Sequence, residues 1–152
     1  ILVTGKGLSG GLYPIAATLM TRQLHAFFDH NPHIHISTFG GAELGCPVAL
    51  AVLDLVEADG FLGRVVELAD RFRNGLAGMP FELRQRGLMM WLAFAQDGGG
   101  MAAAAALYEA GVFTVWAAND PKVLQFLPTL TLTDPEADEL IGRVRAVFEA
   151  AP

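Results

Sequence analysis

The sequence predicts an α/β fold from three observations. Residues 88–95 form an unbroken apolar run with turn signals on both sides, which is typical of a buried strand. Beyond that run, helical and strand-like patterns alternate to the end of the chain. The composition also shifts near Gly60, which predicts two parts, residues 1–59 and residues 60–152.

The elements expected in the first part are mostly short. They are the end of a strand at residues 1–4, a glycine-rich turn at 5–11, a buried strand at 14–20 and a helix at 21–28. Pro32 interrupts the pattern, because proline disfavours helix in the residue before it. Apolar residues then recur at helical spacing and predict a largely buried helix over residues 42–57, which Asp59 and Gly60 end.

The second part is expected to contain three helices and three strands. They are a helix at residues 61–76, a strand at 88–95, a helix at 101–110, strands at 112–116 and 123–126, and a helix at 135–150. The first helix is amphipathic, and Gly78 and Pro80 close it. Gly111 is the expected C-cap of the alanine-rich helix, and Pro135 lies in the first turn of the last one.

Composition excludes several classes of function. The 152 residues are 53% hydrophobic and 17% charged, as in a compact globular chain. A formal charge of -6 disfavours nucleic acid as a partner. Cys46 is the single cysteine, so a reducing, cytoplasmic location is expected without an intrachain disulfide. No apolar run reaches membrane-spanning length, and the mean hydropathy of +0.41 favours a buried interface such as that of a dimer.

Lys6 is the strongest candidate for chemistry, since it stands among glycines and apolar residues in the run ILVTGKGLSGGLYP at the start of the chain. An amine that attacks an aldehyde must be deprotonated, which desolvation or a nearby cation favours. The alternative is a solvated lysine in a surface turn. A phosphate-binding P-loop is excluded, because the order Gly-x4-Gly-Lys-Ser/Thr is absent.

The lysine run and the segment STFGG at residues 37–41 together resemble two loops of the class III (omega) aminotransferases, which are fold-type I pyridoxal phosphate enzymes. Three further segments are similar to this family in the same order: RGLM at 86–89, VLQFLPTL at 123–130 and LTDPE at 132–136. The resemblance implies the C-terminal portion of such an enzyme. Residues 1–59 would end the large domain with its connecting helix, and residues 60–152 would form the small α/β domain.

The resemblance also implies roles for two residues. Lys6 would form the Schiff base with pyridoxal phosphate and afterwards act as the base that moves a substrate proton. Thr38 would bind the phosphate of the cofactor in a partner subunit, which implies a homodimer with shared active sites. By itself, Thr38 is more typical of a strand-end threonine that satisfies a turn. The family's other catalytic groups would precede Ile1, so the chain looks truncated and is not expected to be active alone.

Gln125 stands where the family usually has an arginine that grips a substrate carboxylate. A neutral amide binds a carboxylate less strongly than a guanidinium does. The expected reaction is therefore amino transfer from an amine, diamine or omega-amino acid donor to a 2-oxo acid. Arg84 and Arg86 are candidates for a compensating cation.

Other interpretations stay open. A decarboxylase, epimerase or aminomutase of the same superfamily would use the same lysine, and a non-catalytic α/β interaction module would use none. His33 and His35 have the spacing of a zinc site, yet a histidine cluster in a loop is more often solvated, and no metal is expected. Cys46 is expected to be inert, and the glycines at 98–100 to form a plain connection.

Overall fold

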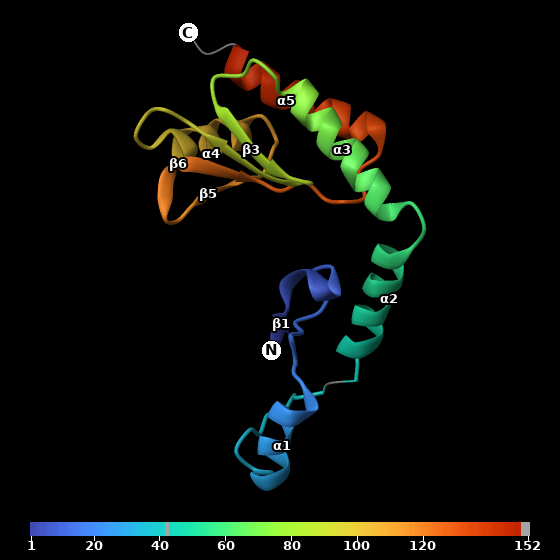
Figure 1. Ribbon diagram of the computed structural model, residues 1–152. Coiled ribbons are helices and arrows are strands. Elements are labelled where there is room, and N and C mark those ends of the chain that lie inside the picture. The colour runs from blue at the N-terminus through green and yellow to red at the C-terminus, as the bar shows by residue number, and fades with distance from the viewer. Residues whose placement is uncertain (42, 150–152) are drawn as a thin grey trace. The chain divides into compact units, whose positions relative to one another are not determined.

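The computed structural model describes residues 1–41 and 43–149, which divide into two compact units, Ile1–Phe61 and Leu62–Pro152 (Figure 1). The elements in chain order are β1 (Leu2–Thr4), the 3₁₀ helix η1 (Lys6–Ser9), β2 (Ala17–Leu19), α1 (Arg22–His30), α2 (Gly45–Glu57), α3 (Phe61–Gly75), β3 (Glu82–Arg86), β4 (Met89–Ala93), α4 (Gly99–Glu109), β5 (Val115–Ala117), β6 (Asp120–Phe126) and α5 (Asp134–Glu149).

Unit 1 is built on a two-stranded antiparallel ribbon of β1 and β2, in which Leu2 pairs with Leu19. The strand expected over residues 14–20 is therefore present as β2 but is shorter. Its expected burial is wrong, because within residues 1–41 and 43–149 β1 is the one strand that pairs with it, and Leu19 is 53% exposed. The glycine-rich turn at residues 5–11 is confirmed and contains η1.

Two helices complete unit 1. Helix α1 is confirmed, and the Thr21 hydroxyl caps it by accepting from the Leu24 amide at 3.4 Å. Helix α2 packs against η1 and is confirmed from Gly45, whereas Ala42, where it was expected to begin, lies outside the described residues. Its expected burial is wrong: Gly45 and Ala49 are its buried residues, and Leu50 is 60% exposed. Apolar residues lie around most of the circumference of α2, whereas η1 packs against one face of the helix, so that apolar side chains on its other faces are exposed.

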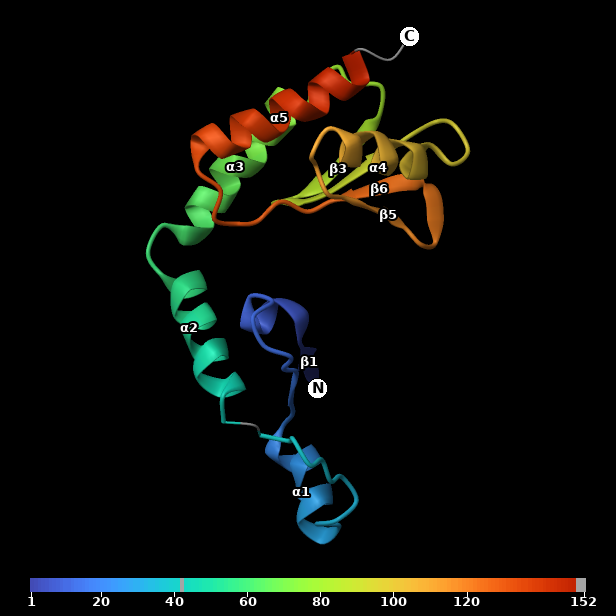
Figure 2. The same cartoon turned by 180° about the vertical axis from the view of Figure 1, so that it is seen from behind.

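Unit 2 is a four-stranded antiparallel sheet in the order β3-β4-β6-β5, with α3, α4 and α5 on one face (Figures 1 and 2). The predicted helices and strands of this part are confirmed within a few residues, except that Ala150, the predicted end of the last helix, lies outside the described residues. Strand β3 was not predicted. It pairs with β4 through Leu83 and Leu92, although its sequence ELRQR is mostly polar.

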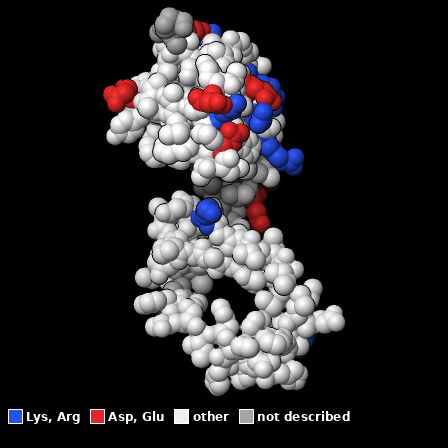
Figure 3. Space-filling model, turned by 90° about the vertical axis from the view of Figure 1, so that its left-hand side faces the viewer, with Lys and Arg blue, Asp and Glu red and all other residues white. Residues whose placement is uncertain are grey.

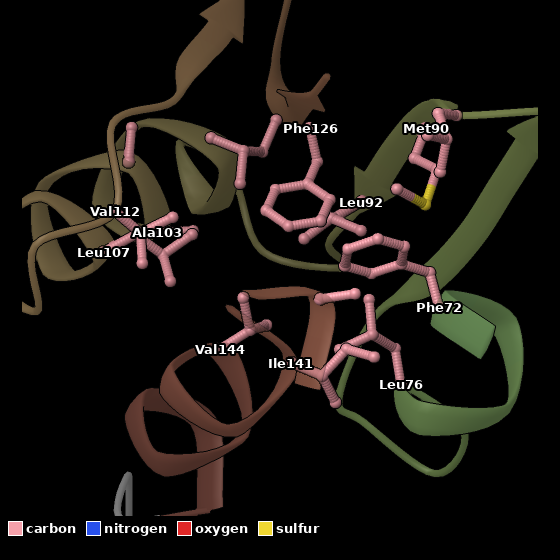
Figure 4. Close-up of a cluster of buried hydrophobic side chains, with 14 of the residues drawn as sticks. Phe72, Leu76, Met90, Leu92, Ala103, Leu107, Val112, Phe126, Ile141 and Val144 are labelled. Atoms are coloured by element: carbon pink, nitrogen blue, oxygen red, sulfur yellow. The ribbon is translucent and has the colours of Figure 1, made fainter. Parts of the chain in front are cut away.

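The hydrophobic core lies in unit 2 between the sheet and the three helices (Figure 4). Phe72 of α3 meets Phe126 of β6 edge-on, with ring centroids 5.7 Å apart. Helices α3 and α5 approach closely, because a Cβ on Gly75 would stand 2.8 Å from the Ile141 side chain. This close contact fixes the two helices against each other. The three helices lie on the same face of the sheet, and no described helix of unit 2 covers the opposite face.

Charged side chains join the same two helices on the surface. The Asp134 carboxylate accepts hydrogen bonds from the guanidinium groups of Arg64 and Arg71, both in α3, the second at 2.7 Å. Arg71 also forms an ion pair with Asp138 of α5. In the view of Figure 3, acidic and basic side chains gather over unit 2 and are sparse over unit 1. Unit 1 instead exposes large apolar side chains, including Ile1, Leu12 and Phe39.

Candidate functional site

Lys6 is the first residue of η1 and follows directly after β1. Its φ of 48° makes it the one non-glycine residue with left-handed backbone among those that the structure describes. An L-residue disfavours this region, since its Cβ crowds the following carbonyl oxygen. The chain therefore holds a lysine where glycine would fit with less strain.

The turn around Lys6 is fixed by its neighbours. Ser9 is 2% exposed and donates its hydroxyl to the Tyr13 carbonyl at 2.5 Å. A Cβ on Gly10 would stand 3.3 Å from Val52 of α2, so the end of η1 lies tightly against that helix. The backbone below Lys6 is thus held in place by α2 and by Ser9.

The Lys6 side chain is exposed, and no described residue offers its amine a hydrogen bond or an ion pair. The other lysine of the chain, Lys122, differs in this respect. Its ammonium lies 2.9 Å from a carboxylate oxygen of Asp97, and the hydrogen bond to Asp97 raises the pKa of Lys122 above its ordinary value. The ammonium of Lys122 is therefore engaged by a carboxylate of its own unit.

Thr38 lies in an exposed turn of unit 1, in which the Gly40 amide donates to the Ser37 carbonyl at 3.1 Å. Gly41 follows with a φ of 70°, which favours glycine. Apolar side chains on both sides of Thr38 are open to solvent: Ile36 is 75% exposed and Phe39 84%. Thr38 and Lys6 belong to the same unit but stand on different loops, and no hydrogen bond within the described residues joins them.

Gln125 belongs to β6 in unit 2, where it pairs with Trp91 of β4 and Val115 of β5. Trp91 pairs on its other side with Arg84 of β3. Residues opposite one another in antiparallel strands share a face, so Arg84, Trp91 and Gln125 form one row across the sheet. This row lies on the face away from the three helices. The sequence does not place Arg84, because ELRQR contains one apolar residue, Leu83, and so lacks the alternation that predicts a strand.

The remaining candidates gain no support as sites. His25 Nδ1 lies 3.7 Å from a carboxylate oxygen of Asp29, and the His35 ring contacts the Phe28 ring edge-on. Within residues 1–41 and 43–149, no three or more metal-ligating side chains come together. Cys46 is exposed in the first turn of α2. None of the helices in these same ranges is both long and apolar enough to cross a membrane.

The comparison with protein families decides the classification. Residues 1–148 match the family described as aminotransferase class-III. The chain belongs to the class-III aminotransferase family. An uncharacterized aminotransferase of Archaeoglobus fulgidus is 38% identical over 157 aligned residues, which cover 99% of this chain and 37% of the relative. The chain thus spans little more than a third of the length of that relative.

Solved aminotransferases share the fold. An ornithine aminotransferase from Toxoplasma gondii, described with partial occupancy of PLP at its active site, superposes with a TM-score of 0.84 and 29% identity over 97% of this chain and 36% of its own. An acetylornithine aminotransferase from Elizabethkingia anophelis gives a TM-score of 0.83 and 25% identity over 98% of this chain and 40% of its own. The predicted family and fold class are therefore confirmed: the chain has the fold of part of a fold-type I pyridoxal phosphate aminotransferase.

Proposed function

We propose that this chain supplies the lysine of a pyridoxal phosphate-dependent aminotransferase, and that Lys6 is that lysine. The observation that carries the proposal is the contrast between the two lysines of the chain. The Lys122 ammonium is paired with Asp97, whereas Lys6 presents an amine without a described partner from a backbone held in the left-handed region. A lysine kept at strained backbone points to a need for its side chain.

The residues around Lys6 fit the cofactor. Glycines on both sides let a flat, phosphorylated ligand approach the backbone, and the exposed amine is open to an aldehyde. When bound, pyridoxal phosphate supplies an electron sink for the reacting substrate carbon. Lys6 Nζ would hold the cofactor, take the proton from that carbon and return it at the cofactor's own carbon.

We infer that the two units have the domain roles that the family resemblance implies. Unit 1 would contribute the end of the large cofactor-binding domain, as expected for residues 1–59, and unit 2 the small domain, as expected for residues 60–152. Gln125 would face substrate from the small domain. The donor would be an amine, diamine or omega-amino acid and the acceptor a 2-oxo acid, which is supported by the ornithine and acetylornithine enzymes among the similar structures.

Thr38 is proposed to bind the cofactor phosphate of a partner subunit. The exposed Ile36 and Phe39 beside it support this role, because a second copy would cover them. The protein would then act as a homodimer in the cytoplasm. Mixing Thr38→Ala with Lys6→Ala protein should restore activity in heterodimers, in which one site has both defects and the other has neither. Heterodimers that form without regaining activity would refute the shared site.

Chemical trapping tests the role of Lys6 directly. The protein is incubated with pyridoxal phosphate, reduced with borohydride and digested, and the modified peptide is identified by mass spectrometry. The cofactor should map to Lys6 and disappear in Lys6→Ala, together with the yellow colour. Lys122→Arg is the matched control and should keep the label on Lys6.

A label on Lys122 or on the N-terminal amine would refute the assignment. The absence of any specific label would favour the non-catalytic module. A labelled enzyme that releases carbon dioxide or inverts its substrate without transferring the amino group would favour the decarboxylase or the epimerase.

A further inference from the structure

Helix α4 carries an unbroken run of alanines over residues 102–106. Alanine has no side chain beyond Cβ, so this part of the helix leaves space beside the neighbouring strand β5, against which α4 packs. A cavity of about 490 Å³ occupies this space, and Ala104 and Ala105 form part of its wall. Its volume lies within the range of about 300–1,000 Å³ that is typical of small-molecule sites.

Aromatic side chains form other walls of this cavity. They come from three places in unit 2: Tyr108 of α4, Phe113 of the loop that follows, and Trp116 of β5. Trp116 lies on the helix side of the sheet, because it pairs with Leu124, which is fully buried in the core. The three aromatic side chains are 66%, 80% and 44% exposed, and no described ring contacts them. Their faces are therefore open to a ligand.

The charged residue in the cavity wall is Glu109, which is exposed at the end of α4. No described residue forms an ion pair with it. The nearby Arg143 is engaged elsewhere, since its guanidinium donates at 2.8 Å both to Glu139 and to the carbonyl of Ala110. The C-terminal end of a helix also adds negative potential through the helix dipole. The cavity wall thus favours a positively charged ligand.

We propose that the cavity between α4 and β5 binds a small organic cation with a quaternary ammonium group. The faces of aromatic rings attract such a cation, and its methyl groups can pack against the alanines without losing hydrogen bonds. A primary ammonium is less well suited, because its three N–H donors need acceptors that rings and alanine methyls do not provide. Glu109 supplies the opposite charge.

This inference goes beyond the proposed aminotransferase function, because every residue that it uses belongs to unit 2. Lys6→Ala should therefore bind the cation as the parent protein does. A loss of cation binding in that variant would contradict a site formed by unit 2 alone, whereas failure of cofactor trapping at Lys6 would leave this site as it is.

The test compares choline with 3,3-dimethylbutan-1-ol, which has the same shape but carries a carbon in place of the charged nitrogen. Trp91→Phe leaves Trp116 as the single tryptophan, so that indole fluorescence reports binding in the cavity. In this background choline should bind at least about fivefold more tightly than the alcohol, as expected for a cation over aromatic faces. Equal binding of the two would mean an apolar patch only and would overturn the proposal.

Replacing the rings separates the aromatic contribution from simple apolar contact. Tyr108→Leu and Phe113→Leu keep an apolar side chain at exposed positions but remove the aromatic face. Each should reduce the preference for choline by about two- to fivefold and leave binding of the alcohol unchanged. A preference that persists in both variants would refute the role of the rings.

Glu109→Gln tests the counter-charge and should weaken choline binding by about two- to fivefold, without an effect on the alcohol. Glu57→Gln is the matched control, because Glu57 is likewise exposed and is the last residue of its helix, α2. It should bind choline as the parent does. Equal losses in the two variants would assign the effect to net charge instead of to this cavity.

Filling the cavity locates the site. Ala105→Leu should abolish binding of both ligands, whereas Ala102→Leu, at an exposed position of the same helix that does not line this cavity, should bind choline normally. The proposal is overturned if Ala105→Leu leaves choline binding intact, or if choline does not change the fluorescence of Trp116 in the parent.

Discussion

Gly100 of α4 lies so close to Val123 of β6 that a Cβ on the glycine would stand 2.5 Å from the Val123 carbonyl carbon. The obstacle is backbone, which cannot rotate away as a side chain tip can. The small residue at position 100 therefore sets how near α4 lies to the sheet, and the core residues Ala103 and Leu107 of the same helix depend on that distance.

Replacing Gly100 with alanine should destabilise unit 2 by about 1–3 kcal/mol, the usual effect of overpacking a close contact. Gly142→Ala in α5 is the control, because a Cβ there meets nothing within 4 Å. That change should be neutral or stabilising by up to about 1 kcal/mol. Urea unfolding of both variants measures the difference, and equal midpoints would contradict the close approach.

The backbone of Lys6 gives a second prediction that does not involve catalysis. At a φ of 48°, Lys6→Gly should be more stable than Lys6→Ala by about 1 kcal/mol, because only glycine adopts this region without strain. Hydrogen exchange at the η1 amides measures the local stability of the turn. Two variants with the same protection would mean that the turn stores no strain.

Acid should weaken the packing of α5. The hydrogen bond from Arg64 lowers the pKa of Asp134, and bonds from the amide and hydroxyl of Thr133 lower the pKa of Glu136. Both pKa values are lower in the folded than in the unfolded chain. The stabilisation is thus complete above the ordinary range of carboxylates and is lost as the pH falls through the lowered values.

Unfolding of unit 2 as a function of pH tests this sign. Stability should be level near neutral pH and decline in the acid range, and the decline should be smaller in a variant with Asp134→Asn and Glu136→Gln together. An unchanged acid transition in that variant would assign the loss to other carboxylates.

Gln125→Arg should strengthen donors that bear a carboxylate by about 1–2 kcal/mol, the difference between charged and neutral hydrogen bonds. Paired kinetics with δ-aminovalerate and pentylamine measure it as a change in the ratio of kcat/KM. If the ratio stays the same, position 125 does not face the substrate carboxylate.

Particular residues show which elements of the fold can be predicted from the sequence. Helix α3 was predicted to within a residue because its apolar positions repeat every three or four. Strand β3 was missed because Gln85 faces the helices where an apolar residue was expected, and its amide donates to the Ala69 carbonyl of α3 at 2.7 Å. Without β3, Arg84 could not be placed in one row with Trp91 and Gln125.

Burial was harder to predict than structure. Leu50 and Leu19 are apolar but exposed. Their burial was predicted wrongly, because an apolar residue type does not indicate whether a partner surface is present to cover it. Lys6 was identified from its neighbours in sequence, yet nothing in the sequence indicated its backbone angle. Strain of this kind depends on contacts such as that between Gly10 and Val52, which are far apart along the chain.

The uneven distribution of the core has a consequence for the timescale of motion around Lys6. The buried cluster belongs to unit 2, whereas the buried residues described in unit 1 are Ser9, Gly45 and Ala49. Amides of β4 and β6 should exchange only when unit 2 unfolds, while those near Lys6 open locally and far more often. A ligand that binds only the closed turn shifts the equilibrium away from the open state, and the shift grows with the concentration of the ligand. The concentration of ligand therefore sets the fraction of time that the turn around Lys6 is closed.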